Sequence, residues 1–368
     1  MTALTDKLAR RIRAAGPLTI EQFMQAALQD PEHGYYRRGR PFGAAGDFIT
    51  APEISQVFGE LIGLWAGVCW QQMGAPAALQ LIELGPGRGT LIADALRAAR
   101  QVPGFTDAVT VQLVESHAGL RDEQQRRLPA GTEVHWHEVL DDVPAGPFIM
   151  IANEFIDALP VRQFIRRGGA WQERVVVCHD SVGLAFAEAP APYAAALVPG
   201  ALAGAADGSI VEVSPERDRL AAALARRVAA DGGIALIIDY GYYPTKCAAT
   251  LQAVSGHAAV DPLDKPGQSD LTAHVDFAAL AARCAAASDG AARCHGPVAQ
   301  GSFLERLGIR QRTAALIRAA ANDADRHRIA AATDRLIDPA AMGSLFKAMA
   351  VSPNGFPAPA GFEEAGHQ

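Results

Sequence analysis

A glycine-rich corner between an apolar run and a helix-like segment is the part of the sequence best suited to chemistry. The run Leu81–Leu84 leads into Gly85-Pro86-Gly87-Arg88-Gly89 and then Thr90. A strand, a glycine-packed turn and a helix in this order let a ligand approach the backbone at the carboxyl edge of a sheet. Dinucleotide-binding folds place their third glycine one position later, and here Thr90 occupies that position.

Two acids flank this corner. Glu83 stands two residues before the first glycine, where a carboxylate would repel a pyrophosphate but would suit a ligand with an ammonium or sulfonium group. Glu115, followed by Ser116, ends the next apolar run. An acid there can accept hydrogen bonds from both ribose hydroxyls, although dinucleotide folds use one too. A tight turn without a ligand is the alternative. The pattern predicts S-adenosylmethionine, bound by Glu83, Gly85, Pro86, Gly87, Gly89, Thr90, Glu115 and Ser116.

Short apolar runs that alternate with helical segments must position these groups. Continuous rather than alternating hydrophobicity is typical of a parallel sheet covered on both faces. The predicted strands are Leu79–Leu84, Val109–Val114, Glu133–His135, Phe148–Ala152 and Ile234–Ile238, with helices at Thr90–Arg100 and His117–Leu128, and late strands at Ala292–Val298 and Ser344–Val351. This order predicts a doubly wound, Rossmann-like α/β domain.

The predicted domain organisation has three parts. An N-terminal helical region covers residues 1–75, the α/β domain covers 76–352 with an inserted substructure at about 161–215, and a flexible tail covers 353–368. The apolar segment Ile54–Trp70 is expected to form a long helix that packs against the core or against a second copy, so a homodimer is possible.

Composition excludes several classes of protein. The chain has 368 residues, of which 49% are hydrophobic, and a formal charge of −7, so we expect a large core and no nucleic-acid partner. No apolar stretch is long enough for a membrane span. The five cysteines form no Cys-x-x-Cys pair, which favours free thiols and a cytoplasmic location. His135 and His137 lack a third ligand at suitable spacing, so no metal site is predicted.

Five segments in order resemble the MidA-like family, the bacterial relatives of a mitochondrial methyltransferase that acts in complex I assembly. They are Gly46–Gln56, Glu83–Thr90, Asn153–Pro160, Asp239–Gly241 and Asp270–Phe277. The resemblance implies a class I S-adenosylmethionine-dependent methyltransferase fold. Mitochondrial members are protein arginine methyltransferases that form symmetric dimethylarginine on a complex I subunit. The resemblance therefore implies a protein substrate, such as a subunit of that complex.

The residues after the fourth predicted strand suit an arginine acceptor. A guanidinium is always protonated, so an enzyme that methylates it benefits from carboxylates that orient it and take its proton. By analogy of position, not of motif, Glu154 corresponds to the first acid in the two-glutamate loop of arginine methyltransferases, and we expect it to bind the guanidinium, with Asp157 second. The alternative for Glu154 is a solvated loop acid, and the alternative for Asp157 is a helix N-cap or turn residue. Asn153 could hold the methionine part of the cofactor or an amine substrate.

Other segments could complete the site. Tyr240, after the fifth predicted strand, could line the substrate channel, or it could simply pack. His274 could contact the substrate, or it could be an ordinary residue at a helix start. The loop Gly46–Thr50 could fold over the cofactor as a lid, with Gly46, Asp47 and Thr50 toward its amino-acid end, or it could be purely structural.

Other activities remain open from the sequence. Instead of an arginine, the methyl acceptor could be a small amine or an oxygen nucleophile. A third alternative is an assembly factor that binds S-adenosylmethionine without catalysing transfer.

Overall fold

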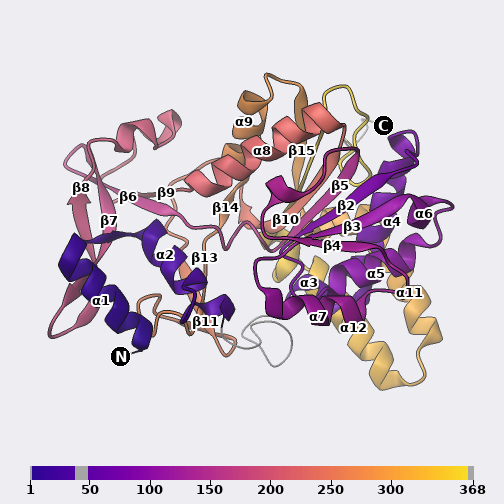
Figure 1. Ribbon diagram of the computed structural model, residues 1–368, viewed down its shortest axis with the longest axis horizontal. Helices are drawn as coiled ribbons and strands as arrows, with labels where there is room; N and C mark the ends of the chain where they lie inside the picture. Colours follow the sequence, from indigo (N-terminus) through magenta and orange to yellow (C-terminus); the bar gives the residue numbers. More distant parts are fainter. Residues whose placement is uncertain (1, 38–48, 364–368) are drawn as a thin grey trace. The chain divides into compact units, whose positions relative to one another are not determined.

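Residues 2–37 and 49–363 are described by the computed structural model, in which the chain forms two units (Figure 1). The first, here called the sheet unit, comprises Ile49–Ile156, Leu220–Tyr242 and Phe277–Gln368. The second, here called the accessory unit, comprises Met1–Phe48, Asp157–Arg219 and Tyr243–Asp276.

The sheet unit is built on a mostly parallel sheet with the strand order β15–β16–β10–β5–β2–β3–β4. The strands β4, β3, β2, β5 and β10 run parallel, whereas β16 is antiparallel to both β10 and β15. The chain builds outward from β2 and then returns to β5 on the other side, so the switch point lies between β2 and β5. The bounds are β2 Leu79–Leu84, β3 Val109–Val114, β4 Val134–His137, β5 Phe148–Asn153, β10 Ile234–Tyr242, β15 Ala292–Ala299 and β16 Phe346–Pro353. The predicted doubly wound fold is confirmed.

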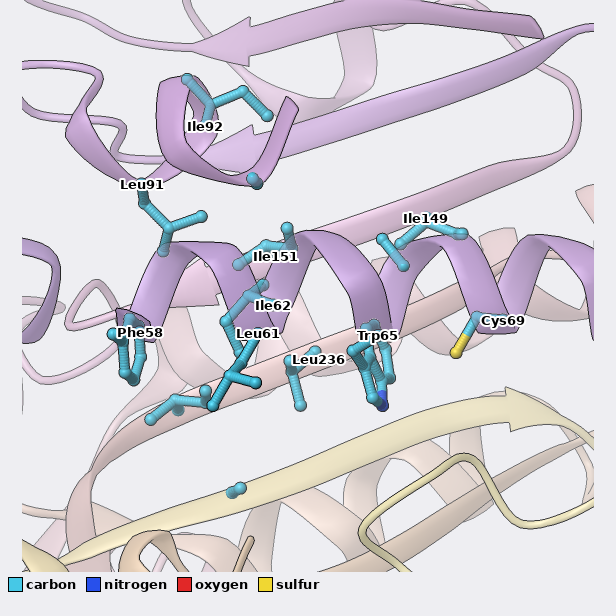
Figure 2. Packing of buried hydrophobic residues seen from close by; sticks show 14 of the residues in the cluster. Phe58, Leu61, Ile62, Trp65, Cys69, Leu91, Ile92, Ile149, Ile151 and Leu236 are labelled. Carbon is cyan, nitrogen blue, oxygen red and sulfur yellow. The ribbon is translucent and has the colours of Figure 1, made fainter. Parts of the chain in front are cut away.

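One face of this sheet is covered by α4 (Gln56–Gln72) and α5 (Thr90–Ala99). Figure 2 shows Ile62 and Trp65 of α4 near Ile151 and Leu236 of the sheet. These residues are at most 1% exposed, and burying each large apolar side chain stabilises the fold by about 1.5–3 kcal/mol. The predicted helix at Ile54–Trp70 is confirmed, although it starts at Gln56 after the short helix α3 (Ala51–Ile54). Its apolar face packs in the core, the first of the two expected alternatives.

The opposite face is covered by α8 (Pro215–Asp231) and α9 (Phe277–Ala287). Leu224 of α8 and Leu280 of α9 line a small apolar void with Met150 and Ile237. Residues on the two faces alternate along β5, because Ile149 and Ile151 face α4 while Met150 faces α8. The remaining helices are α6 Phe105–Ala108, α7 Ala118–Arg127, α10 Gln300–Arg306, α11 Ile309–Ala319, α12 Asp323–Ile337 and α13 Met342–Leu345.

The accessory unit combines two helices with small antiparallel sheets. Its strands follow in the order β1–β7–β6–β9, with β8 on β7, and a second sheet has the order β12–β11–β13. The bounds are α1 Ala3–Ala15, α2 Ile20–Gln29, β1 Leu18–Thr19, β6 Arg162–Arg167, β7 Ala170–His179, β8 Gly183–Pro190, β9 Ile210–Val213, β11 Gln252–Ser255, β12 Ala258–Val260, β13 Asp270–Thr272 and β14 Val275–Asp276. Leu8, Phe23, Val176 and Leu271 share its core.

This division differs from the predicted domain organisation. The N-terminal helices and the inserted substructure, expected to be separate, share one unit in which Leu18 pairs with Val176. The apolar faces of α1 and α2 predict that these helices pack, but periodicity carries no information about the surface that they pack against.

The end of the chain also differs from the expected flexible tail. Phe362 is 6% exposed and its ring lies 5.1 Å from that of Phe303. The indole nitrogen of Trp65 donates a hydrogen bond of 3.1 Å to the carbonyl of Ala360. A composition rich in glycine and proline disfavours regular secondary structure but does not prevent packing, so residues 353–363 are held by tertiary contacts. Among the described residues, no helix has the length and hydropathy of a membrane-spanning segment.

Candidate active site

The glycine corner connects β2 to α5 through left-handed backbone. Gly85, Gly87 and Gly89 have φ angles of +62°, +51° and +77°, a region that glycine adopts at least cost. The amide of Gly85 donates to the carbonyl of Val114 at 3.1 Å, and the amide of Gly89 donates to that of Pro86 at 2.8 Å. A Cβ atom on Gly85 would lie 2.6 Å from the ring of Phe155. The backbone therefore requires glycine here.

Glu83 is buried directly before this corner. Glu83 is 3% exposed, and its Oε2 atom has no hydrogen-bond partner among the described residues. The pKa of Glu83 is raised to about 8, mainly by burial and also by the nearby Glu115, while the backbone N–H of Ile92 acts to lower it. A buried carboxyl oxygen without a donor is costly. A cationic ligand group that donates N–H bonds would remove this cost, so the residue fits the predicted cofactor.

The end of β3 is tied to the corner by a residue that the sequence analysis missed. Gln124 of α7 is fully buried. Its Nε2 donates to the carbonyl of Gly87 at 2.7 Å, and its Oε1 accepts a 2.7 Å bond from the indole of Trp136. Glu115 is 8% exposed and accepts a 2.7 Å bond from the amide of His117, whereas Ser116 is exposed. Nothing in the polar sequence of α7 distinguishes Gln124 from the neighbouring Gln125.

The side chain of Thr90 is engaged by protein groups. Its Oγ1 donates a 2.5 Å hydrogen bond to Oε1 of Glu53 and accepts one of 2.5 Å from Nη1 of Arg127. Arg88, within the corner, makes a 2.6 Å ion pair with Glu123 and lies 3.8 Å from Glu53. Spacing alone suggested a cofactor contact for Thr90 and gave no indication of this network.

Glu154 follows β5 in an unusual conformation. Its φ angle is +50°, which costs a residue with a Cβ about 1–2 kcal/mol. The amide of Glu154 donates to the carbonyl of Ile238 at 2.9 Å, and its Oε1 accepts bonds from the amide of Ala51 at 2.7 Å and from Nδ2 of Asn153 at 3.3 Å. Asn153 is 9% exposed, and within the described chain its Oδ1 has no hydrogen-bond partner.

Asp239, in β10 directly after the residues that pair with β5, fixes the turn that follows Glu154. This carboxylate is fully buried, and its two oxygens accept bonds of 2.9 Å each from the amides of Ile156 and Tyr240. The signal in the sequence is an acid directly after the apolar run Ile234–Ile238, whereas the residue predicted there was the neighbouring Tyr240. Tyr240 is 5% exposed and its ring packs edge-on at 5.3 Å against Phe346.

Asp157 and His274 belong to the accessory unit, where Arg217 brings their backbones together. The guanidinium of Arg217 donates to the carbonyl of Asp157 at 3.0 Å and to that of His274 at 2.7 Å. Asp157 is 5% exposed and its Oδ1 accepts a 2.8 Å bond from the amide of Ala158. Burial lowers the pKa of His274. Both residues remain predictions as functional groups.

The expected lid is only partly described. Gly46 and Asp47 lie outside the described residues. Thr50 stands directly before α3 with extended backbone, and in the described part of the chain its side chain makes no capping hydrogen bond. No group of three or more His, Cys, Asp or Glu side chains that could hold a metal ion occurs among the described residues. His137 instead bonds to Oε1 of Gln112 at 2.6 Å.

Comparison with known families now adds to this geometry. Residues 61–298 match the family described as "Putative S-adenosyl-L-methionine-dependent methyltransferase". This chain belongs to that family. S-Adenosylmethionine is its cofactor, so the prediction from the glycine corner is confirmed, as is the resemblance to the MidA-like family.

Relatives of known name cover nearly the whole chain. It is 37% identical to protein arginine methyltransferase NDUFAF7 homolog, mitochondrial, of Drosophila melanogaster, over 95% of this chain and 85% of that protein. It is 34% identical to the human NDUFAF7 protein over 96% of this chain and 84% of the relative. A solved COG1565 superfamily member from Burkholderia thailandensis, bound to S-adenosyl-homocysteine, superposes with a TM-score of 0.82 at 28% identity, covering 99% of this chain and 95% of that one.

The comparisons correct one expectation. A cytoplasmic location was predicted from the cysteines, but the curated relatives are named as mitochondrial proteins. Free thiols exclude only an oxidising compartment and therefore do not distinguish the cytoplasm from other reducing compartments.

Proposed function

We propose that this methyltransferase methylates an arginine nitrogen of a partner protein and that Glu154 binds the guanidinium. The names of the relatives support a protein arginine as the acceptor. The proposal rests mainly on the position of Glu154, which lies directly after β5 and beside the switch point of the sheet. Its carboxylate accepts hydrogen bonds from the amide of Ala51 and the side chain of Asn153. Ligands bind at this edge in open α/β sheets.

The cofactor side of the site is assigned to residues around the corner. Gly85, Gly87 and Gly89 let the backbone approach the ligand, and Glu115 lies at the end of β3 for the ribose. Glu83 provides a carboxylate for the cationic amino group, which would satisfy its Oε2 atom. When bound, S-adenosylmethionine supplies a methyl group on a cationic sulfur, which an incoming nitrogen lone pair can attack.

The acceptor side has to orient a cation and remove a proton. A carboxylate at Glu154 can bind two N–H groups of a guanidinium in its plane and so point the remaining nitrogen. The same carboxylate can accept the proton that the nitrogen loses as it is methylated. Its left-handed backbone is maintained by the bond from the amide of Glu154 to Ile238 and by the carboxylate of Asp239 behind the turn. Holding the attacking nitrogen in the correct orientation accounts for much of the lowering of the activation barrier in displacement reactions.

The partner proposed here is a subunit of respiratory complex I, following the MidA-like resemblance. Asp157 and His274 are kept as candidates for contacts with that partner. Their shared connection through Arg217 means that the two segments hold each other in place within the accessory unit.

Replacing Glu154 with Gln tests the proposal. Gln retains an acceptor for the amide of Ala51 but loses the charge, so we expect methyl transfer to arginine to fall at least about 100-fold. Binding of S-adenosyl-homocysteine should change by less than about threefold, because the cofactor contacts remain. Transfer is measured with labelled cofactor and identified as methylarginine after hydrolysis. The control is Glu305→Gln, at an exposed ion pair with Arg310 in the same unit. Undiminished transfer in Glu154→Gln would exclude the proposed role.

A small amine is the second candidate acceptor because of Asn153. Its buried Oδ1 atom has no partner among the described residues and could accept a bond from an amine N–H. Label that appears only in small molecules, with no methylarginine in protein, would favour this candidate.

A further inference from the structure

The short helix α3 is attached at both ends to the two halves of the site. At its start, the amide of Ala51 donates to Oε1 of Glu154. At its end, Glu53 accepts a 2.5 Å bond from Oγ1 of Thr90, the first residue of α5. Glu53 also lies 3.6 Å from Arg127 and 3.8 Å from Arg88. A single turn of helix therefore connects the glycine corner to the proposed guanidinium ligand.

A helix of this length cannot hold its own position. Only four residues, Ala51–Ile54, are helical, and nucleating a helix costs more than one turn recovers. Ala51 and Pro52 are buried, which limits movement toward or away from the core. Sliding along the surface of the core is opposed mainly by polar contacts, because apolar packing is not directional. In α3 the side-chain polar contacts come from Glu53, and the amide of Ala51 adds its backbone bond to Glu154.

We infer that Glu53 is a positioning residue, which holds α3 against Thr90 and Arg127 and thereby orients the carboxylate of Glu154. This inference rests on the proposed role of Glu154. The side chain of Glu53 is 18% exposed and lies among Thr90, Arg127 and Arg88, so its own contacts are with protein groups. Its effect on transfer passes through the bond between Ala51 and Glu154, which fixes the carboxylate from outside β5 and its turn.

Glu53→Ala should therefore separate catalysis from cofactor binding. Loss of the contacts to Thr90 and Arg127 lets α3 shift, and displacement of a reacting group by about 1 Å can cost about 100-fold in rate. We expect kcat to fall about 10- to 100-fold while the KM for S-adenosylmethionine changes less than about threefold. Glu53→Gln keeps an acceptor for Thr90 and should retain most of the wild-type kcat. A residue that only stabilised the fold would not produce this split.

Hydrogen exchange gives a readout that does not depend on the acceptor. In the full-length protein, the peptide that contains Ala51 should exchange at least about fivefold faster in Glu53→Ala than in the wild type, since its amide loses a fixed acceptor. If wild-type protein transfers no methyl to arginine, the proposed function fails, yet the exchange result still reports whether Glu53 holds α3. Unchanged exchange in Glu53→Ala would overturn the inference even if arginine is the acceptor.

A matched control comes from the same network. Glu123 binds Arg88 at 2.6 Å and Arg127 at 3.4 Å and has a side-chain exposure of 24%, close to that of Glu53, but it lies on α7. Glu123→Ala should slow transfer much less than Glu53→Ala and leave exchange at Ala51 unchanged. Equal losses in both variants would mean that the charge network acts as a whole, which contradicts a specific role for Glu53. If Glu53→Ala does not fold, Glu53→Gln and Glu53→Asp are compared by the same two measurements.

Discussion

The glycine corner and the turn at Glu154 follow neighbouring parallel strands, β2 and β5, yet they are held in different ways. The corner is specified locally, because three glycines with positive φ angles and the start of the helix α5 lie within ten residues of Glu83. The turn is specified by distant segments. The amide of Ala51, the carbonyl of Ile238 and the carboxylate of Asp239 all come from other parts of the sequence.

This difference indicates which half of the site can tolerate substitutions elsewhere in the chain. The corner depends mainly on its own residues, whereas the turn depends on the packing of several elements. A transferase that binds one common donor can use the same corner with many acceptors, while the acceptor side has to be assembled from elements that vary. Variants of the two regions should therefore separate cofactor affinity from catalytic rate.

The largest effect is expected at Gly85. In Gly85→Ala a Cβ atom would lie 2.6 Å from the ring of Phe155, and a φ angle of +62° would be strained. The corner cannot keep its shape, so affinity for S-adenosyl-homocysteine should fall by at least about 100-fold, since each kind of strain costs about 1–3 kcal/mol. Calorimetry measures the affinity. Gly200→Ala is the control, because its Cβ atom would meet nothing within 4 Å. Normal binding by Gly85→Ala would contradict the local specification of the corner.

A smaller effect with a characteristic pH dependence is expected at Glu83, whose pKa of about 8 is raised mainly by burial. Between about pH 4.5 and 8 the unfolded chain has lost this proton and the ligand-free fold keeps it, so stability falls as the pH rises and levels off above about 8. A cationic cofactor favours the carboxylate and should release a proton on binding near pH 7. Glu83→Gln should remove the slope and the proton release, and it should weaken cofactor binding about 10-fold.

Calorimetry in buffers of different ionisation enthalpy measures the proton release for Glu83, and chemical unfolding at several pH values measures the slope. The control is Glu305→Gln, whose exposed carboxylate should leave both unchanged. Binding without proton exchange in the wild type would show that Glu83 does not face the cationic group.

Much of the fold could be predicted because its determinants are local. The strands Leu79–Leu84 and Val109–Val114 were predicted with their observed bounds, since buried parallel strands are continuous apolar runs that end at turns. Late strands were also expected, at Ala292–Val298 and Ser344–Val351. They are observed at Ala292–Ala299 and Phe346–Pro353 and complete the sheet. Glu83 and the three glycines were proposed as cofactor-binding residues from local spacing and charge, and this assignment remains a prediction.

The parts that could not be predicted depend on long-range contacts. Gln124 and Asp239 act through bonds to Gly87 and Ile156, which are far from them in sequence. Spacing predicted Thr90 as a cofactor-binding residue, which remains a prediction, but it gave no indication that the hydroxyl of Thr90 binds Glu53 and Arg127. The grouping of the N-terminal helices with residues 157–219 in the accessory unit has the same origin, since an amphipathic pattern does not name its partner.

The smallest effect is expected from the substitution of Asp239. This substitution tests only the turn after Glu154, which is the proposed acceptor side of the site. Asp239→Asn keeps one oxygen for the amide of Ile156 or Tyr240 and presents an NH₂ group to the other, so one buried N–H loses its acceptor. The turn after Glu154 should loosen, which lowers kcat about threefold to tenfold while cofactor affinity stays within about twofold, because no contact of the glycine corner changes. Steady-state kinetics and calorimetry measure the two quantities. Asp338→Asn is the control, since this exposed aspartate also accepts a backbone bond, from Ala340 at 2.8 Å. Equal losses of affinity and rate in Asp239→Asn would mean that the two regions are held together as one structure, and the distinction between a local corner and an assembled turn would fail.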